Sequence, residues 1–265
     1  MAPTVEDILT PFRLAGESVV ITGATGALGS AAARALYQAG ARLTLAGGNE
    51  QRLASLVAQL RGTGQASVVP MRPDDPDAAE GIVSAAIDAF GTVDGLLVAS
   101  GVNHVAPIVE MAVADFDRVQ SANVRGSWLM CQAVGRRLLA QGTGGSVVLV
   151  SSTRGRLGHP AGYSAYCPSK AAVDLLVKSL AAEWGSHRIR VNALAPTVFR
   201  SELTAWMYED DDKGRATREA MLGRIPLGRL AEPEDFVGAL IYLLSGASSF
   251  LTGQVLYLDG GYTAC

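Results

Sequence analysis

The stretch "SVVITGATGALGSAAARAL", residues 18–36, decides the fold. It reads as a short β-branched strand, a turn containing Gly23, Gly26 and Gly29, and an alanine-rich helix. Glycines allow the chain to turn tightly and bring the free N–H groups at the helix start close to a pyrophosphate. Because the strand and the helix flank the turn in the required order, the stretch favours a dinucleotide site over an ordinary turn.

The same alternation of apolar runs and helix-like segments continues along the chain. Nearly continuous apolar runs are typical of strands covered on both faces, and the alternation predicts a parallel sheet with right-handed crossovers. We therefore expect one α/β domain over residues 1–265, a Rossmann-like doubly wound sheet of about seven parallel strands flanked by helices. The expected strands are 18–22, 42–46, 66–71, 94–99, 146–151, 190–195 and 254–259.

One segment, residues 197–232, interrupts this rhythm between the last two strands. It is amphipathic in part and carries an acidic run at its centre. Long insertions of this kind often serve as lids or binding loops, so we predict a substrate lid at about 197–232. Trp206, Met207 and Tyr208 within it fit either an apolar flap or ordinary helix packing.

Composition narrows the classes of partner and compartment. The chain has 265 residues, 49% hydrophobic and 18% charged, with a formal net charge of −3. It offers no basic footprint for nucleic acid or an anionic membrane, and no apolar run near the roughly 18 residues that span a bilayer. The separate Cys131, Cys167 and Cys265 suit a reducing compartment, and the polar N-terminus is no secretory signal, so we expect a cytoplasmic protein. The three scattered histidines predict no catalytic metal.

A second short motif, "YCPSK" at residues 166–170, places Tyr166 and Lys170 four positions apart. This spacing puts both side chains on one face of a helix. Such a pair can be a surface contact that steadies the helix. Alternatively, the ammonium of Lys170 lowers the pKa of the phenol from about 10, which makes Tyr166 a usable acid or base.

Six ordered stretches resemble the short-chain dehydrogenase/reductase family over residues 12–262. The resemblance implies a nicotinamide cofactor, a homotetramer and a catalytic set of Asn123, Ser152, Tyr166 and Lys170. Ser151 is a rival for the serine, but the "TRG" that follows favours Ser152. Asn123 could instead merely cap a local turn. The matching stretches are "TGATGALG" (22–29), "ANV" (122–124), "VSS" (150–152), "YCPSK", "IRVNALAP" (189–196) and "LTGQVLYLDGG" (251–261).

The resemblance also implies a role for each site residue. Ser152 would donate to the substrate oxygen, Lys170 would bind the nicotinamide ribose, and Asn123 would hold a water that links Lys170 to solvent. Apolar helices at about 108–140 and 163–185, with the C-terminal strand, would form the subunit contacts. The implied cofactor contacts are Gly23, Thr25, Gly26, Leu28, Gly29, Gly48, Arg72, Gly101, Tyr166, Lys170, Pro196, Val198 and Ser201.

Departures from the family pattern concern the adenosine end and the sheet centre. No acid stands near Gly48, where the ribose is usually read, and Arg72 replaces an aspartate expected near the adenine. The missing acid means that nothing near Gly48 repels or obviously binds a 2′-phosphate, so it does not decide between the cofactors, and Arg72 slightly favours NADP(H) over NAD(H). The sequence "VASG" (98–101) replaces the usual "NNAG", which predicts a loss of polar support for the central sheet.

The function that this pattern favours is an NAD(P)-dependent oxidoreductase interconverting a secondary alcohol and a ketone. The segment around Arg154 resembles family members acting on sugar acids or polyols, such as gluconate dehydrogenases. Arg154 could bind a carboxylate or a hydroxyl-rich substrate, or be an exposed or subunit-contact arginine, while His104 and Tyr163 could line the cleft. A 3-oxoacyl thioester reductase is the alternative enzyme, and a cofactor-binding regulator or scaffold without turnover is the alternative of another class.

Overall fold

The computed structural model describes residues 5–209 and 211–265. Within them, seven strands form one sheet in the order β3-β2-β1-β4-β5-β6-β7, and every neighbouring pair is parallel. This confirms the predicted α/β doubly wound class. The strands are β1 (Ser18–Thr22), β2 (Arg42–Ala46), β3 (Gln65–Val69), β4 (Gly95–Val98), β5 (Gly145–Val150), β6 (Ile189–Pro196) and β7 (Val255–Leu258).

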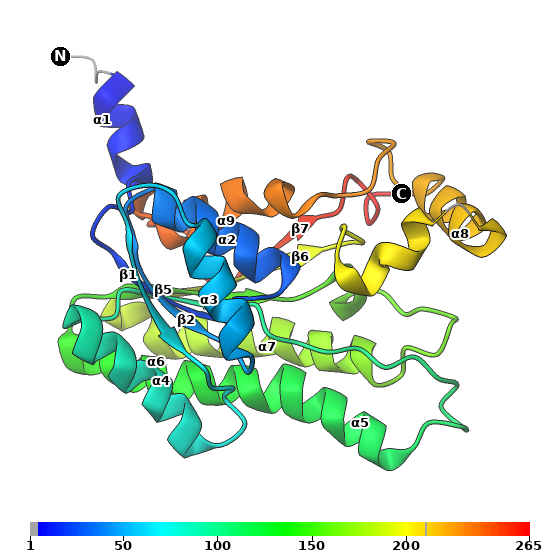
Figure 1. The fold of residues 1–265 in the computed structure, drawn as a ribbon, viewed down its shortest axis with the longest axis horizontal. Coiled ribbons are helices and arrows are strands. Elements are labelled where there is room, and N and C mark those ends of the chain that lie inside the picture. Colours follow the sequence, from blue (N-terminus) through cyan, green and yellow to red (C-terminus); the bar gives the residue numbers. More distant parts are fainter. Residues whose placement is uncertain (1–4, 210) are drawn as a thin grey trace.

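Helices cover both faces of the sheet (Figure 1). Those packed on one face are α2, α3 and α9, and those on the other face are α4, α6 and α7. The short α1 extends away from the body of the molecule (Figure 1). Their bounds are α1 (Val5–Leu9), α2 (Ala27–Gln38), α3 (Glu50–Gln59), α4 (Pro76–Phe90), α5 (Val113–Gln120), α6 (Gly126–Gln141), α7 (Tyr166–Trp184), α8 (Asp212–Leu222) and α9 (Val237–Leu244).

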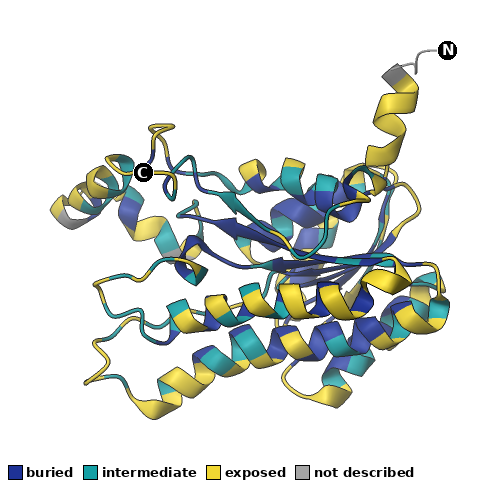
Figure 2. Ribbon diagram, turned by 180° about the vertical axis from the view of Figure 1, so that it is seen from behind, coloured by how far each residue is buried: buried dark blue, intermediate teal, exposed yellow. Residues whose placement is uncertain are grey.

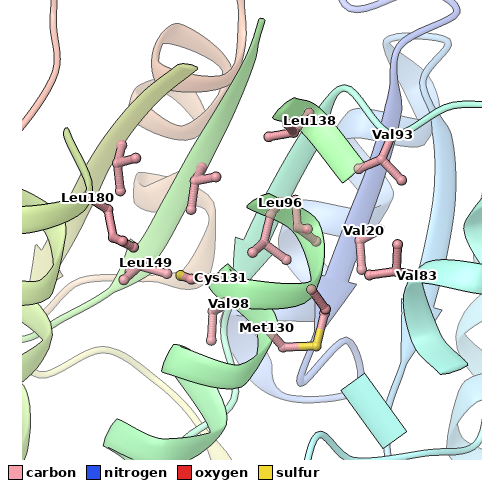
Figure 3. Close-up of a cluster of buried hydrophobic side chains, with 14 of the residues drawn as sticks. Val20, Val83, Val93, Leu96, Val98, Met130, Cys131, Leu138, Leu149 and Leu180 are labelled. Atoms are coloured by element: carbon pink, nitrogen blue, oxygen red, sulfur yellow. The ribbon is translucent and has the colours of Figure 1, made fainter. Parts of the chain in front are cut away.

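The two cores explain why the strands are apolar without alternation. Side chains of a strand point to opposite faces in turn. In β1, Val20 joins the core beneath α4, α6 and α7, whereas Val19 and Ile21 join the core beneath α2, α3 and α9. Figure 3 shows the first of these cores, where Val20 lies near Val83 and Met130. A strand with a core on each face has no solvent-facing positions, so a polar alternation would leave polar groups buried.

The boundaries of the third strand differ from the prediction. We expected residues 66–71, and β3 ends at Val69. Pro70 follows immediately, and proline has no N–H to continue the ladder with β2.

Residues 197–232 form two helical pieces rather than a structureless loop. A 3₁₀-helix runs over Glu202–Tyr208 and is followed by α8, whose N-cap Asp211 accepts a 2.6 Å hydrogen bond from the Gly214 N–H. Met207 is buried against Tyr262 and other apolar residues, whereas Trp206 is 40% exposed. Of the apolar trio, Met207 therefore packs in the interior, whereas Trp206 lies partly at the surface.

Candidate active site

The glycine turn after β1 forms a cradle that only glycine permits. Gly23 has a φ of +67°, and a Cβ atom there would lie 2.5 Å from the Ser100 backbone nitrogen. A Cβ atom on Gly29 would collide with the Gly23 carbonyl oxygen, so α2 can approach the turn this closely only without a side chain at 29. The open N-terminus of α2 faces the cavity described next, and this arrangement fits a dinucleotide pyrophosphate.

A cavity of about 590 Å³ lies along the carboxyl ends of the strands. It spans the point between β1 and β4 at which the strand order reverses, where ligands bind in sheets of this class. The cavity brings together residues that are far apart in the sequence. Those that we had predicted are Thr25, Gly26, Leu28, Gly101, Ser152, Tyr166, Lys170, Pro196 and Ser201.

The sequence interpretation missed several residues that line this cavity. They include Ser100, Val102, Asn103, Thr197 and Phe199. All of them follow directly after β4 or β6, and this position alone was a usable signal because parallel strands end at the same edge of the sheet. Other missed residues come from the outer rim and gave no such signal, namely Arg34 and Arg52.

Val198 does not line the cavity with the other predicted cofactor residues. Its side chain packs against the cluster of Met207, Ile225, Leu230 and Tyr262 instead. Its neighbours Thr197 and Phe199 line the cavity.

Gly48 and Arg72 meet at a second, adjoining cavity of about 260 Å³ beside the glycine turn. A Cβ atom on Gly48 would collide with Arg72 Nε and lie 3.1 Å from its Cζ atom. The guanidinium thus occupies the space where an acidic side chain would stand. Among residues 5–209 and 211–265, no carboxylate forms an ion pair with Arg72.

Tyr166 and Lys170 lie in the first turns of α7, where the four-residue spacing holds them on one face. Lys170 is 4% exposed, its Nζ donates a 2.8 Å hydrogen bond to the Val150 carbonyl oxygen, and it lies 5.7 Å from the Tyr166 ring centroid. Burial lowers the pKa of Lys170 to about 8, against the opposing charge of Asp174. A surface pair would be solvated, so this alternative is wrong.

Tyr166 does not have the lowered pKa that we expected from Lys170. Burial raises the pKa of Tyr166 to about 12, although a hydrogen bond with Ser152 and the charge of Arg154 act in the opposite direction. The prediction is wrong because desolvation of the phenolate outweighs the nearby cations. The cation that favours the phenolate is Arg154, for which the sequence interpretation had not considered a role toward Tyr166.

The two rival serines differ in their contacts. Ser152 Oγ accepts a 3.1 Å hydrogen bond from the Arg154 backbone N–H, and the Ser152 side chain is close enough to Tyr166 to act on the pKa of its phenol. Ser151 Oγ, in contrast, is buried and has no hydrogen-bond partner among the described residues. Ser152 is therefore the serine that faces the tyrosine hydroxyl.

Asn123 lies in a π-helical turn, Ser121–Arg125, between α5 and α6. Its amide nitrogen donates 2.9 Å hydrogen bonds to the Val102 carbonyl and to Ser169 Oγ, and its Oδ1 accepts a 2.8 Å bond from the Val102 N–H. Asn123 thus clamps the loop after β4 to the start of α7. Single π-helical turns of this kind are frequent at functional sites.

Arg154 is nearly buried, so its interpretation as an exposed arginine is wrong. Its guanidinium donates 3.0 Å hydrogen bonds to the Gly158 carbonyl and to the Tyr262 hydroxyl. Tyr163 packs edge-on against Tyr166, with ring centroids 6.1 Å apart, and is not among the residues that line the larger cavity.

Two further sequence expectations are resolved by local contacts. His104 lies outside the cavity lining, because Asp115 holds it at 3.6 Å and Arg118 at 3.3 Å. The predicted loss of polar support at "VASG" is wrong, because Ser100 Oγ lies 3.1 Å from Thr22 Oγ1 and joins β1 to the end of β4. Ser100 thus makes the polar link that we expected to be missing.

Searches for other kinds of site gave no candidates in the described parts of the chain. Residues 5–209 and 211–265 contain no group of three or more His, Cys, Asp or Glu residues arranged to hold a metal ion. No helix within these same ranges has both the length and the apolar character needed to cross a bilayer.

A glycine cradle beside a partnered tyrosine, serine and buried lysine defines the class as a nicotinamide-dependent oxidoreductase on a Rossmann-like fold. Comparison with known proteins agrees with this class. The family model described as enoyl-(acyl carrier protein) reductase matches residues 23–263. The chain belongs to the short-chain dehydrogenase/reductase family.

Relatives and solved structures match along nearly the whole chain. An uncharacterized oxidoreductase of Mycobacterium tuberculosis is 70% identical over 97% of this chain and 95% of its own. The D-threitol dehydrogenase of Mycolicibacterium smegmatis is 39% identical over 95% of each chain. The crystal structure of a gluconate 5-dehydrogenase from Burkholderia cenocepacia, in complex with NADP and tartrate, superposes with a TM-score of 0.89 at 30% identity, covering 97% of this chain and 99% of that one.

Proposed function

We propose that this protein interconverts a secondary alcohol and a ketone by hydride transfer, with Tyr166 as the acid and base. The observation that carries the proposal is that Ser152, Tyr166 and Lys170 line the same cavity beside the glycine turn, with Tyr166 and Lys170 on one face of α7. The hydroxyl groups of Ser152 and Tyr166 can converge on one substrate oxygen. Regulators and scaffolds have no need of a tyrosine, a serine and a buried lysine together at one cavity.

The roles of the residues follow from their contacts. The nicotinamide, when bound, supplies the hydride in reduction and accepts it in oxidation. Ser152 donates a hydrogen bond to the substrate oxygen, and Tyr166 gives that oxygen its proton as negative charge develops during reduction. Lys170 binds the nicotinamide ribose, and its ammonium supplies positive charge to the site. Asn123 positions α7 through Ser169. In oxidation, the proton moves from the alcohol back to Tyr166.

We assign the cofactor preference to NADP(H). Support comes from the unpaired Arg72 guanidinium beside Gly48, which suits a 2′-phosphate and has no neighbouring acid to repel one. The related gluconate 5-dehydrogenase structure holds NADP. Residues 197–232 serve as the substrate lid in this proposal, since Ser201 and Phe199 already line the cavity.

Sugar acids and polyols are the substrate class that we favour. Related proteins are named for threitol and gluconate, and both substrates are small and rich in hydroxyl groups. A 3-oxoacyl thioester reductase is the second candidate. The matching family model is described as enoyl-(acyl carrier protein) reductase, an enzyme that also reduces acyl thioesters. We further propose a homotetramer working in the reducing cytoplasm, where the free cysteines Cys131, Cys167 and Cys265 would persist.

The test is a panel of polyols, aldonates, ketoses and 3-oxoacyl thioesters, followed by nicotinamide absorbance with both cofactors. Tyr166→Phe removes the proton-donating hydroxyl while keeping the ring, so turnover should fall by roughly 10²–10⁴-fold. Cofactor affinity, measured by fluorescence titration, should change little. Tight cofactor binding without turnover of any panel member would favour the scaffold alternative, and full activity in the variant would overturn the role of Tyr166.

A further inference from the structure

A group of cationic side chains surrounds a buried tyrosine next to the proposed catalytic hydroxyls. Tyr262, near the C-terminus, is only 1% exposed. The guanidinium carbons of Arg154 and Arg224 lie 5.5 Å and 4.2 Å from its ring centroid. We call these three residues the arginine–tyrosine cluster. It joins the loop after β5, the end of the proposed lid and the end of the chain.

The cluster contains positive charge without a counter-ion. Other arginines of the same region are paired, as Arg229 is with Asp235 and Arg200 with Glu232. In the part of the chain that the structure describes, no carboxylate forms an ion pair with Arg154 or Arg224. Arg154 is only 9% exposed, and its guanidinium hydrogen-bonds to two neutral oxygens, those of Gly158 and Tyr262. A nearly buried charge without an anion is costly, so an anion from a ligand would complete this site.

Both arginine charges act on the space beside the reaction centre. The ring of Tyr163 lies 4.5 Å from that of His159, 6.0 Å from the Arg154 guanidinium carbon and 6.1 Å from the ring of Tyr166. The pKa of His159 is lowered by burial and then by the charges of Arg154 and Arg224. Arg154 also acts on Tyr166, and its own backbone N–H contacts Ser152. An anion held by Arg154 would therefore lie close to Ser152 and Tyr166, and so close to the substrate oxygen on which these two residues are proposed to act.

We propose that Arg154 and Arg224 bind the carboxylate of a hydroxy-acid substrate, so that this protein prefers sugar acids to neutral polyols and to thioesters. The planar guanidinium of Arg154 can hold a carboxylate through two parallel hydrogen bonds, which a neutral hydroxymethyl group cannot replace. The proposal rests on the function proposed above and names the substrate class of that same site.

A binding experiment tests the subsite without turnover. Tartrate and threitol have the same four carbons and central hydroxyls, but only tartrate carries carboxylates. Each is titrated by calorimetry into enzyme saturated with NADP. Wild type should bind tartrate more tightly than threitol, and Arg154→Gln should weaken tartrate binding by roughly tenfold to a hundredfold. Equal affinity for the two ligands in wild type, or undiminished tartrate affinity in the variant, overturns the proposal.

Two further variants distinguish recognition of the carboxylate from a purely structural role of the Arg154–Tyr262 hydrogen bond. Arg156→Gln removes an exposed arginine two positions along, which lies over Tyr257, and should leave tartrate affinity unchanged. Arg154→Lys loses the planar fork as completely as glutamine does but keeps the charge, so it should retain part of the affinity. If lysine keeps the full wild-type affinity, the two parallel hydrogen bonds of the guanidinium do not hold the carboxylate and the proposal fails.

The catalytic counterpart is the ratio of kcat/KM for gluconate to that for glucitol, which differ by one carboxylate. Arg154→Gln should lower this ratio by roughly tenfold to a hundredfold, and an unchanged ratio contradicts the proposal. If no alcohol or ketone is turned over at all, the proposed function fails, while the calorimetric comparison still decides the subsite.

Discussion

At Tyr166 and Lys170, burial acts on an acid and a base in opposite directions. It raises the pKa of Tyr166 to about 12 and lowers the pKa of Lys170 to about 8. Both shifts favour the neutral form, because a charge loses its hydration when it is buried. At neutral pH Tyr166 thus carries the proton that ketone reduction requires, and Lys170 is still charged. The pair is therefore set for reduction near pH 7.

A specific pH dependence follows for ketone reduction. Lys170 is charged below its pKa and neutral above it, so kcat/KM should be constant near pH 7 and fall about tenfold per unit once the pH exceeds about 8. The tyrosine titrates too far above this range to contribute. Initial rates at low ketone concentration and saturating NADPH measure the profile.

Asp174 provides the matched variant for this profile. Its charge opposes the lowering of the Lys170 pKa, so Asp174→Asn should move the alkaline limb to lower pH. A limb at the same pH in both proteins would show that Lys170 is not the titrating group.

At the scale of the element, the turn between β1 and α2 illustrates what a sequence can specify. Gly29 is required by a backbone contact six residues away, and such local chemistry is visible as a motif. The strands were predictable for a similar reason, since two covering helix layers impose continuous apolar runs. The contact between Arg154 and Tyr262 joins residues 108 positions apart, and no local pattern marks it. Burial of Tyr166, which reversed the expected pKa shift, is likewise a product of tertiary packing.

Gly29→Ala should destabilise this turn. The added methyl group collides with the Gly23 carbonyl oxygen. Because the methyl group is fixed to the backbone of α2 and the carbonyl is itself backbone, no side chain can move to relieve the collision. We therefore expect a loss of about 1–3 kcal/mol in the free energy of unfolding. Gly238→Ala in α9 is the control, because no atom lies within 4 Å of its new methyl group, and it should be neutral or stabilising by up to about 1 kcal/mol. Urea denaturation compares the two, and equal effects would contradict the steric argument.

The proposed preference for NADP(H) depends on two residues that follow β2 and β3, Gly48 and Arg72. Arg72→Gln should weaken NADPH binding by roughly tenfold and leave NADH binding nearly unchanged, since only NADPH has the 2′-phosphate. Gly48→Asp should also weaken NADPH binding, because the new carboxylate neutralises Arg72 and repels the 2′-phosphate. Dissociation constants of both nucleotides provide the measurement. A parallel loss for NADH would mean that Arg72 contacts a part that the two nucleotides share.

At the scale of the whole molecule, the helix layer beneath the sheet has an outer side without a cover in a single chain (Figure 2). Apolar side chains are exposed on three successive helices of this layer, with Val113 of α5 at 74%, Trp128 of α6 at 47% and Leu175 of α7 at 64%. The expected contact segment at 108–140 is helical only from residue 113, yet Ile108 and Val109 before it are also exposed. Exposed apolar side chains on successive helices of one layer are typical of an interface. Two residues of the candidate active site lie close to this surface, since Tyr166 begins α7 and Asn123 lies between α5 and α6.

The assembly can be tested through this surface. Leu175→Glu places a charge in the middle of the proposed interface, where it would be buried without a partner, so the proposed tetramer should dissociate into smaller species. Ala54→Glu adds the same charge at an exposed position of α3 on the opposite layer and should leave the assembly intact. Light scattering coupled to size-exclusion chromatography gives the mass of each. Because α7 begins at Tyr166, dissociation should also lower kcat by loosening the helix that positions the catalytic hydroxyl. A Leu175→Glu protein with the mass of wild type would show that this apolar face is not the contact between subunits.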